Sequence, residues 1–129
     1  MLIRQPKGLE KFLRDKSWVL ADGATGTNLF NLGLSSGEAP EFWNKTARNK
    51  IKALYRGSVD AGSDLFLTNS FGANRSRLKL HGAERYATEL SRVSAEIGRE
   101  IADAHNRMVI VAGCIGPTGE LMEPMGNLS

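Results

Sequence analysis

The sequence lacks paired cysteines: among its 129 residues, Cys114 is the only one. A single cysteine excludes an intrachain disulfide and any metal site that one copy would build from several cysteines. Long apolar runs are also missing, since no segment approaches the roughly 20 apolar residues of a membrane-spanning helix. The N-terminal apolar stretch is too short for a secretory signal. The sequence therefore predicts a cytoplasmic protein without a membrane span.

An excess of one charge sign is absent as well, with 17 basic and 14 acidic residues and a formal net charge of +3. The densest basic groups lie on predicted helices: Lys50, Lys52 and Arg56, then Arg75, Arg77 and Lys79. No aromatic platform or nucleic-acid-binding motif accompanies them. A solvated helix face explains these groups better than a nucleic-acid patch, so we expect no nucleic-acid partner.

What the sequence does contain is three apolar runs, each ending in a loop of glycine, hydroxyl, amide and carboxyl groups. Residues 18–21 run into 22–28, residues 64–67 into 68–74, and residues 108–113 into 114–120. Each run has the length and composition of a buried strand. With helices between them, the strands should lie parallel and all three loops should emerge at one edge. Ligands bind at that carboxyl edge in parallel α/β folds.

Helical periodicity fills the chain between these runs. The predicted helices span residues 9–15, 46–60, 75–80 and 84–105, with a helical turn at 29–34. The longest carries an apolar stripe at steps of three and four: Tyr86, Leu90, Val93, Ile97, Ile101 and Ala104. Gly62 is well placed for the left-handed position beyond a helix cap. The order indicates one β-α-β-α-β unit with right-handed crossovers.

The first loop is rich in glycine, but it has neither the lysine of a P-loop nor the glycine spacing of a dinucleotide fold. It offers the Asp22 carboxylate followed by backbone N–H groups that Gly23 and Gly26 leave accessible. This pairing suits a zwitterion, with Asp22 on an ammonium group and the amides on a carboxylate. Spacing alone leaves an alternative equally open: Asp22 caps the turn and the glycines permit tight backbone angles.

The second and third loops add further polar groups. About one of Asn69 and Ser70 should point into a central site, because side chains alternate along a strand. Phe71 either packs in the core or lines a ligand pocket, and both interpretations stay open. In the third loop, Glu120 and Glu123 fit solvated carboxylates better than catalytic ones.

Histidine and cysteine chemistry is weakly supported. His81 and His105 stand at predicted helix ends, where complementation of the helix dipole explains them better than metal binding. Cys114 ends a buried strand without a histidine near it in sequence, which favours a small core residue over a nucleophile. We therefore predict neither catalytic residues nor metal ligands in this chain.

The three loops, in this order and spacing, resemble the homocysteine S-methyltransferase family. The matching stretches are residues 20–27 (LADGATGT), 61–72 (AGSDLFLTNSFG), 116–120 (GPTGE) and 123–126 (EPMG). Residues 37–44 (GEAPEFWN) look especially like the bacterial betaine–homocysteine methyltransferase branch. The homocysteine domain of cobalamin-dependent methionine synthase is similar too. The resemblance covers nearly the whole chain from about Trp18.

The resemblance implies a (β/α)8 TIM barrel, of which residues 1–129 would supply the first three β/α units as an incomplete barrel. It implies methyl transfer from a betaine-like donor or a methylated cofactor to homocysteine, giving methionine. In the family, zinc held by three cysteines makes homocysteine a thiolate. The predicted substrate-binding residues are Asp22, Gly23, Ala24, Thr25, Asn69 and Phe71.

In one respect the chain departs from the family, whose zinc cysteines lie on later strands and are not matched by Cys114. We therefore expect a partial homocysteine-binding domain, truncated after the third strand and its loop, that lacks zinc ligands and is inactive alone. The alternative hypothesis is a non-catalytic module that complements a separate C-terminal part or self-associates through its open sheet edge. A small self-contained three-layer α/β domain is a third hypothesis.

Overall fold

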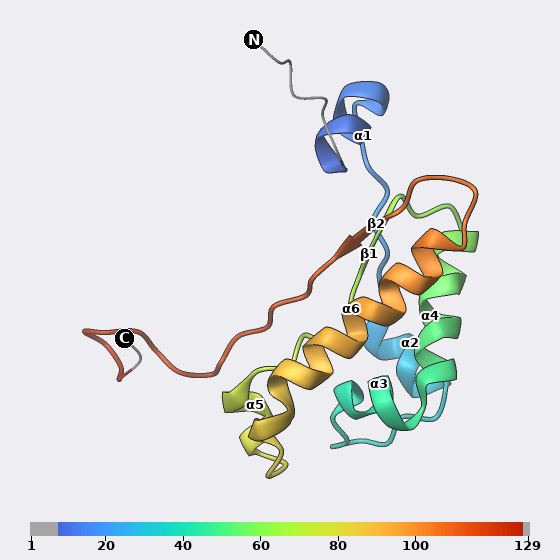
Figure 1. The fold of residues 1–129 in the computed structure, drawn as a ribbon. Helices are drawn as coiled ribbons and strands as arrows, with labels where there is room; N and C mark the ends of the chain where they lie inside the picture. The colour runs from blue at the N-terminus through green and yellow to red at the C-terminus, as the bar shows by residue number, and fades with distance from the viewer. Residues whose placement is uncertain (1–7, 128–129) are drawn as a thin grey trace.

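Helices outweigh strands in the computed structural model, which describes residues 8–127. The elements are α1 (Leu9–Lys16), α2 (Thr25–Asn31), η1 (Pro40–Phe42), α3 (Trp43–Thr46), α4 (Arg48–Asp60), β1 (Leu65–Leu67), α5 (Arg75–Lys79), η2 (Glu84–Tyr86), α6 (Ala87–Asp103) and β2 (Ile110–Ala112). Helices α4 and α6 lie side by side along the two strands (Figure 1). None of the described helices is both long and apolar enough to cross a membrane.

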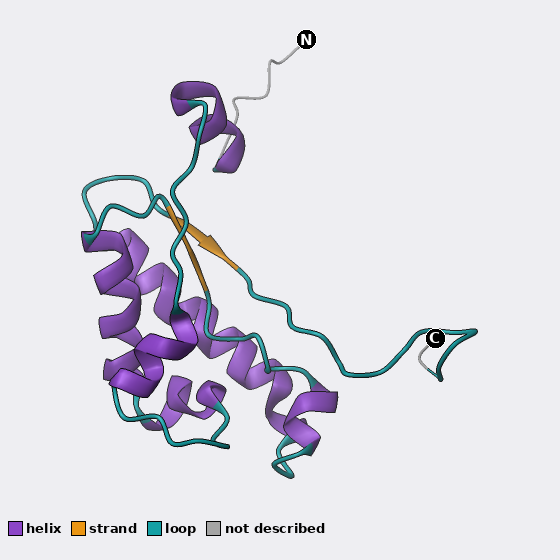
Figure 2. Ribbon diagram, turned by 180° about the vertical axis from the view of Figure 1, so that it is seen from behind, coloured by secondary structure: helices purple, strands orange, loops and turns teal. Residues whose placement is uncertain are grey.

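The two strands pair in parallel, as predicted, with Leu65 opposite Ile110 and Leu67 opposite Ala112 (Figure 2). The predicted first strand over residues 18–21 is reduced to one bridge, between Ala21 and Leu65 on the other side of β1. Around that bridge, the carbonyl of Leu20 accepts the N–H groups of Asp64 and Leu65, and the Asp22 N–H donates to the carbonyl of Leu65. The chain is thus an α/β protein with an open parallel sheet.

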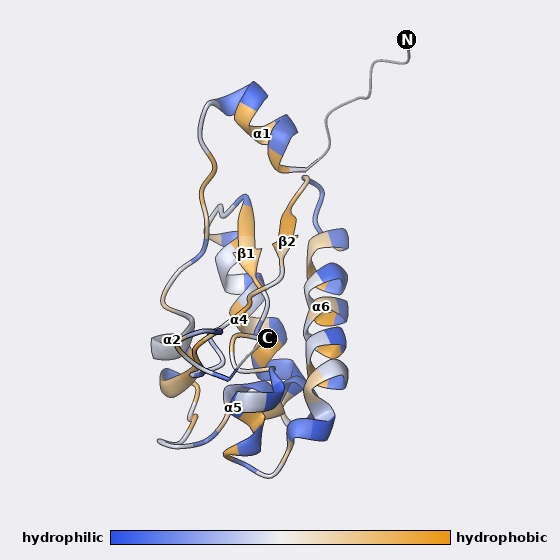
Figure 3. Cartoon of the chain, turned by 90° about the vertical axis from the view of Figure 1, so that its left-hand side faces the viewer, coloured by the Kyte–Doolittle hydropathy of each residue, from blue (hydrophilic) through white to orange (hydrophobic). Residues whose placement is uncertain are grey.

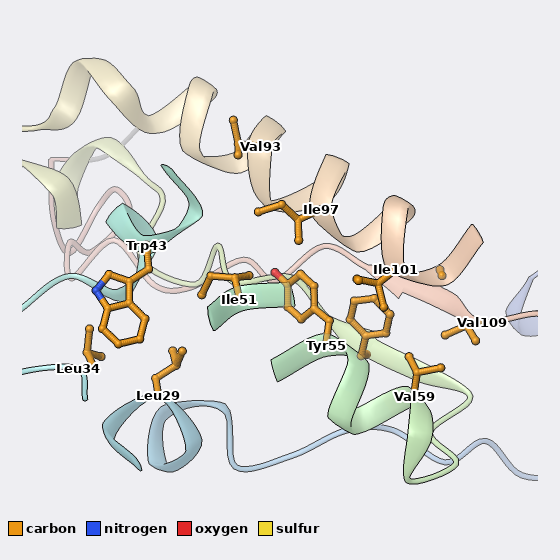
Figure 4. Close-up of a cluster of buried hydrophobic side chains, with 12 residues drawn as sticks. Leu29, Leu34, Trp43, Ile51, Tyr55, Val59, Val93, Ile97, Ile101 and Val109 are labelled. Atoms are coloured by element: carbon orange, nitrogen blue, oxygen red, sulfur yellow. The ribbon is translucent and has the colours of Figure 1, made fainter. Parts of the chain in front are cut away.

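One cluster of buried side chains joins the helices to the strands (Figure 4). Ile51, Tyr55 and Val59 follow each other at four-residue steps on α4, so they share the helix face that turns inward. Ile97 of α6 belongs to the same cluster. The ring of Tyr55 lies 4.8 Å from that of Phe66 on β1, which fixes α4 against the sheet.

The apolar stripe predicted for the longest helix is largely confirmed. Its buried members are Leu90, Val93, Ile97 and Ile101. Ala104 is exposed, contrary to prediction, because α6 ends at Asp103. Gly62 has a φ of 101°, the left-handed conformation predicted for it beyond the end of α4.

One face of the strands is left without helices. The strands are strongly apolar (Figure 3), yet every residue of β2 is only half-buried. Beyond β2 the chain runs away from the body of the molecule (Figures 1 and 2), and Ile115 is 94% exposed. The burial that its composition predicted for the third strand is therefore only partly found within residues 8–127.

Candidate functional site

The three predicted loops do converge at the carboxyl ends of the strands. A pocket of about 310 Å³ lies there. Its walls come from all three loops and from η1: Thr25, Gly26, Leu29, Pro40, Glu41, Leu67, Thr68, Asn69, Phe71 and Cys114. We call it the three-loop pocket. Its volume is near the lower end of the range for small-molecule sites.

Asp22 is fixed at the end of β1 beside this pocket. Its Oδ1 accepts the N–H of Leu67 at 3.2 Å, and its own N–H donates to the carbonyl of Leu65 at 3.0 Å. Burial raises the pKa of the Asp22 carboxyl, and the hydrogen bond from Leu67 opposes that rise. The residue lines a separate groove of about 540 Å³ toward α4. Asp22 therefore lies next to the three-loop pocket through its contact with Leu67, but it lines the neighbouring groove together with Gly23 and is not in the pocket wall.

The first-loop backbone next to Asp22 is open to a ligand. Within the described residues, no backbone carbonyl accepts the N–H of Gly23 or Ala24. Ala24 has a φ of 56°, a left-handed conformation that is uncommon for a residue with a side chain. Thr25 begins α2 and lines the three-loop pocket. Strained backbone of this kind gathers at functional sites, so it is compatible with the predicted anion-binding role.

Asn69 lines the pocket but turns its amide group into the protein. Its Nδ2 donates to the carbonyl of Pro40 at 2.8 Å and to Oδ1 of Asn44 at 3.0 Å. The hydroxyl of Tyr55 accepts the Asn69 N–H at 2.6 Å. Because both amide hydrogens are used, Asn69 has only its Oδ1 to offer a ligand. Its assignment to substrate binding stays a prediction.

A ring of hydrogen bonds that the sequence analysis did not foresee ties the second loop to the third. The N–H of Cys114 donates to Oγ1 of Thr68 at 3.1 Å, and Oγ of Ser70 donates to the carbonyl of Cys114 at 2.7 Å. The two hydroxyls lie 2.8 Å apart. Because the Ser70 hydroxyl hydrogen is donated to Cys114, the Thr68 hydroxyl must be the donor in the hydrogen bond between Thr68 and Ser70. Both hydroxyls are thus used internally.

Phe71 and Glu41 form the outer wall of the three-loop pocket. The sequence left two positions open for Phe71, in the core or in a pocket wall. In the structure Phe71 lines the pocket and is half-exposed. Glu41 is buried, and its Oε1 accepts the N–H of Gly72 at 2.7 Å. Glu41 lies in the 37–44 stretch of the family resemblance, but the sequence did not predict its burial, which depends on a contact with the second loop 31 residues later.

Cys114 faces the pocket as a protonated thiol. Burial raises the pKa of this thiol, and the nearby charges of Asp22 and Glu41 raise it further. The described residues contain no group of three or more His, Cys, Asp or Glu side chains that could hold a metal ion. The donor set that zinc requires is therefore not found in residues 8–127.

The remaining candidates of the sequence analysis lie away from the pocket. His105 is 3.3 Å from the carboxylate of Asp60, and the ring of His81 packs edge-on against Phe42. Glu120 is exposed and accepts a hydrogen bond from the hydroxyl of Ser76. These contacts assign none of them to a ligand.

Comparison with known proteins identifies the family of this chain. Residues 19–129 match the family model of homocysteine S-methyltransferase, which includes all three loops and β1 and β2. The chain belongs to the homocysteine S-methyltransferase family. Relatives include methionine synthase of Mycobacterium leprae, 31% identical over 114 residues, and that of Mycobacterium tuberculosis, 30% identical over 112. Each match covers 80% of this chain and 9% of the relative.

The fold of this family is also found in solved structures. The metallated form of the homocysteine methyltransferase MmuM from Escherichia coli aligns with a TM-score of 0.73 at 23% identity. The oxidised form aligns with a TM-score of 0.74 at the same identity. Each alignment covers 88% of this chain and 42% of MmuM. The chain therefore spans less than half the length of these family members.

Proposed function

We propose that this chain supplies the part of a homocysteine S-methyltransferase that anchors the amino-acid end of homocysteine. The reaction would transfer a methyl group to the homocysteine sulfur and form methionine. The observation that carries the proposal is the convergence of the three family loops at one pocket. Asp22 and Gly23 lie beside it in the adjoining groove toward α4, and within the described residues the N–H groups of Gly23 and Ala24 have no backbone acceptor.

In this proposal each end of the amino acid has its own partner. The ionised Asp22 accepts the α-ammonium group, and the N–H groups of Gly23 to Thr25 bind the α-carboxylate. Asn69 and Phe71 border the remainder of the substrate. The hydroxyl ring of Thr68, Ser70 and Cys114 keeps the second and third loops together while the ligand binds. Fixed partners of this kind reduce the entropy that binding costs.

Residues 1–129, of which 8–127 are described, would form a partial homocysteine-binding domain and the first three β/α units of a TIM barrel. The parallel strands and the match to 42% of MmuM support this assignment. Because the described residues offer no zinc ligand set, we assign no step to zinc and expect the chain alone to be inactive. Cytoplasmic localisation stays a prediction.

Binding of norvaline to the purified chain tests the anchoring role. Norvaline keeps the amino-acid end of homocysteine and replaces its thiol by a methyl group. We expect saturable binding that weakens about tenfold in Asp22→Asn, as loss of one charge-assisted hydrogen bond predicts. Asp60→Asn, at an exposed aspartate of α4, is the matched control. Equal affinity of wild type and Asp22→Asn would refute the role.

A second candidate function is a non-catalytic module that pairs through its sheet edge. Its support is the side of β2 that has no strand partner among residues 8–127, beside which Met108 and Ile115 are exposed. Apolar strand edges of this kind promote association. Light scattering distinguishes the two: a mass that grows with concentration supports self-association, and a constant monomer mass contradicts it. Mixing with a separately expressed C-terminal part of a family member tests complementation.

A further inference from the structure

Asn44 of α3 is a buried amide that joins the second loop to α6. The residue is 0% exposed. Its Nδ2 donates to the carbonyl of Asn69 at 2.9 Å and to the carbonyl of Leu90 at 3.2 Å. Its Oδ1 accepts one hydrogen of the Asn69 side-chain amide, at 3.0 Å from Nδ2 of Asn69. Asn44 and Asn69 therefore form a pair of buried amides at the wall of the three-loop pocket.

The acceptors around this pair fix the orientation of both amides. Carbonyl oxygens only accept hydrogen bonds, so the Asn44 atom that faces the carbonyls of Asn69 and Leu90 is its nitrogen. The oxygen of Asn44 is then turned to the Asn69 amide and takes one of its hydrogens, while the carbonyl of Pro40 takes the other at 2.8 Å. The hydroxyl of Tyr55 also holds the Asn69 N–H. Reversal of the Asn69 amide would place oxygen against oxygen at both of its acceptors.

The side-chain oxygen of Asn69 opens onto the three-loop pocket. Asn69 is 4% exposed, and within residues 8–127 its Oδ1 accepts no hydrogen bond. Among these residues, the one side-chain oxygen or nitrogen that is sealed from solvent without a partner is Oε2 of Glu84. Oδ1 of Asn69 is therefore unpartnered but not sealed, and the pocket that Asn69 lines gives it its opening. At this point the pocket wall presents a hydrogen-bond acceptor and no amide hydrogen.

An acceptor in this wall can bind only one group of the substrate. Homocysteine that reacts as a thiolate has hydrogen-bond donors on its α-ammonium group alone, because its carboxylate and its thiolate carry no hydrogens. That ammonium group has three hydrogens, more than the Asp22 carboxylate uses by itself. Leu67 joins the two places, since its N–H donates to Asp22 and the residue lines the three-loop pocket.

We propose that Oδ1 of Asn69 is a second acceptor for the α-ammonium group, and that Asn44 is the positioning residue that keeps this oxygen toward the pocket. The inference rests on the proposed function and adds to it a preference for an amino group over a hydroxyl group. A reversed Asn69 amide would turn its hydrogens toward the ammonium group and repel it. A hydroxyl group in the same place could accept one of those hydrogens, so it would lose less.

Norvaline and 2-hydroxypentanoate test the inference on the full chain, because they share a carbon chain and a carboxylate and differ in the ammonium and hydroxyl groups. Asn44→Ala removes the acceptor that holds one hydrogen of the Asn69 amide. By calorimetric titration we expect this variant to bind norvaline about tenfold more weakly, and 2-hydroxypentanoate to change by less than about twofold. Asn49→Ala, at an exposed position of α4, should leave both affinities unchanged.

Asn44→Asp separates positioning from stability. The substitution keeps an oxygen for the Asn69 amide but removes the donor to the carbonyls of Asn69 and Leu90. We expect the variant to unfold at a lower urea concentration and still to keep the wild-type preference for norvaline. A merely structural role predicts that the preference falls in both Asn44 variants along with stability, and that result would overturn the inference.

Hydrogen exchange in the wild-type chain tests the amide orientation even if Asn44→Ala fails to fold. NMR should show the side-chain amide hydrogens of Asn69 exchanging at least about tenfold more slowly than those of the exposed Asn49, with or without norvaline. Equal exchange at the two residues overturns the inference. Norvaline binding with an unchanged preference in Asn44→Ala refutes this inference alone, whereas a wild-type chain that does not bind norvaline refutes the proposed function.

Discussion

At the amino ends of the strands, the buried carboxylate of Asp64 is neutralised by the chain itself. Its Oδ1 lies 2.7 Å from Nζ of Lys16, its Oδ2 accepts the N–H of Leu20 at 3.1 Å, and Arg107 lies 3.9 Å away. At the carboxyl ends, Glu41 is equally buried, but among residues 8–127 it accepts one backbone N–H and forms no ion pair. The first carboxylate joins distant segments of the chain through two basic side chains, whereas the second holds η1 against the second loop through one backbone N–H. Equal burial therefore does not mean equal neutralisation, because that depends on the partners of each carboxylate.

Among the variants considered, Asp64→Ala should lower the free energy of unfolding the most. The substitution leaves the Leu20 N–H without its acceptor and Lys16 without its partner. We expect the free energy of unfolding to fall by about 2–4 kcal/mol, as for a broken buried polar contact. Urea unfolding measures it, with Asp60→Ala as the exposed control. A loss below about 0.5 kcal/mol, the size of an ordinary surface change, would contradict the structural role of Asp64.

Thr68→Val should have the next largest effect. Valine keeps the shape of the side chain but removes the hydroxyl that links Ser70 to the Cys114 N–H. Leaving a buried donor unpaired predicts a loss of about 1–2 kcal/mol in unfolding free energy. Thr88→Val, at an exposed position of α6, is the matched control. If the two variants are equally stable, the hydroxyl ring does not hold the loops together.

Gly116→Ala should affect ligand binding more than stability. A Cβ atom at position 116 would lie 2.1 Å from the carbonyl oxygen of Phe71, so the second and third loops must separate. We expect norvaline to bind about tenfold more weakly, while the unfolding free energy falls by about 1 kcal/mol, since separating the loops weakens the hydrogen bonds between them. Gly113→Ala is the control, because no atom lies within 4 Å of its added Cβ. Unchanged binding in Gly116→Ala would show that the pocket tolerates this separation.

The smallest expected effect is a difference in pH dependence between Asp22, at the carboxyl ends of the strands, and Asp64, at their amino ends. The hydrogen bond from Lys16 lowers the pKa of Asp64, so its stabilisation is complete above the ordinary carboxyl pKa and is lost as pH falls through the lower folded value. Burial raises the pKa of Asp22, so its charge is lost at a higher pH. Norvaline binding should therefore fall before stability does as the pH decreases. Titrations of binding and of urea unfolding check this order, and coinciding midpoints would contradict it.

Much of this arrangement follows from local sequence patterns. The three loops were predicted from apolar runs that end in polar residues, and the α4 and α6 stripes from helical spacing. The burial of Glu41 and the hydroxyl ring of Thr68, Ser70 and Cys114 could not be predicted. Each depends on a partner more than 30 residues away. Asn69 was expected near a ligand, yet its amide hydrogens bind within the protein. Local periodicity predicts which elements form, but it carries no information on which polar groups find partners inside.

The open sheet also restricts the symmetry of any assembly that this chain forms by itself. The Ala21 segment and β2 are the two outer members of the sheet, on opposite sides of β1, and both run parallel to it. Parallel pairing of the β2 edge with the Ala21 edge of another copy is heterologous, since each copy uses two different surfaces. Such copies form a ring if the rotation between them closes and an open filament if it does not. A two-fold dimer would instead place two β2 strands antiparallel.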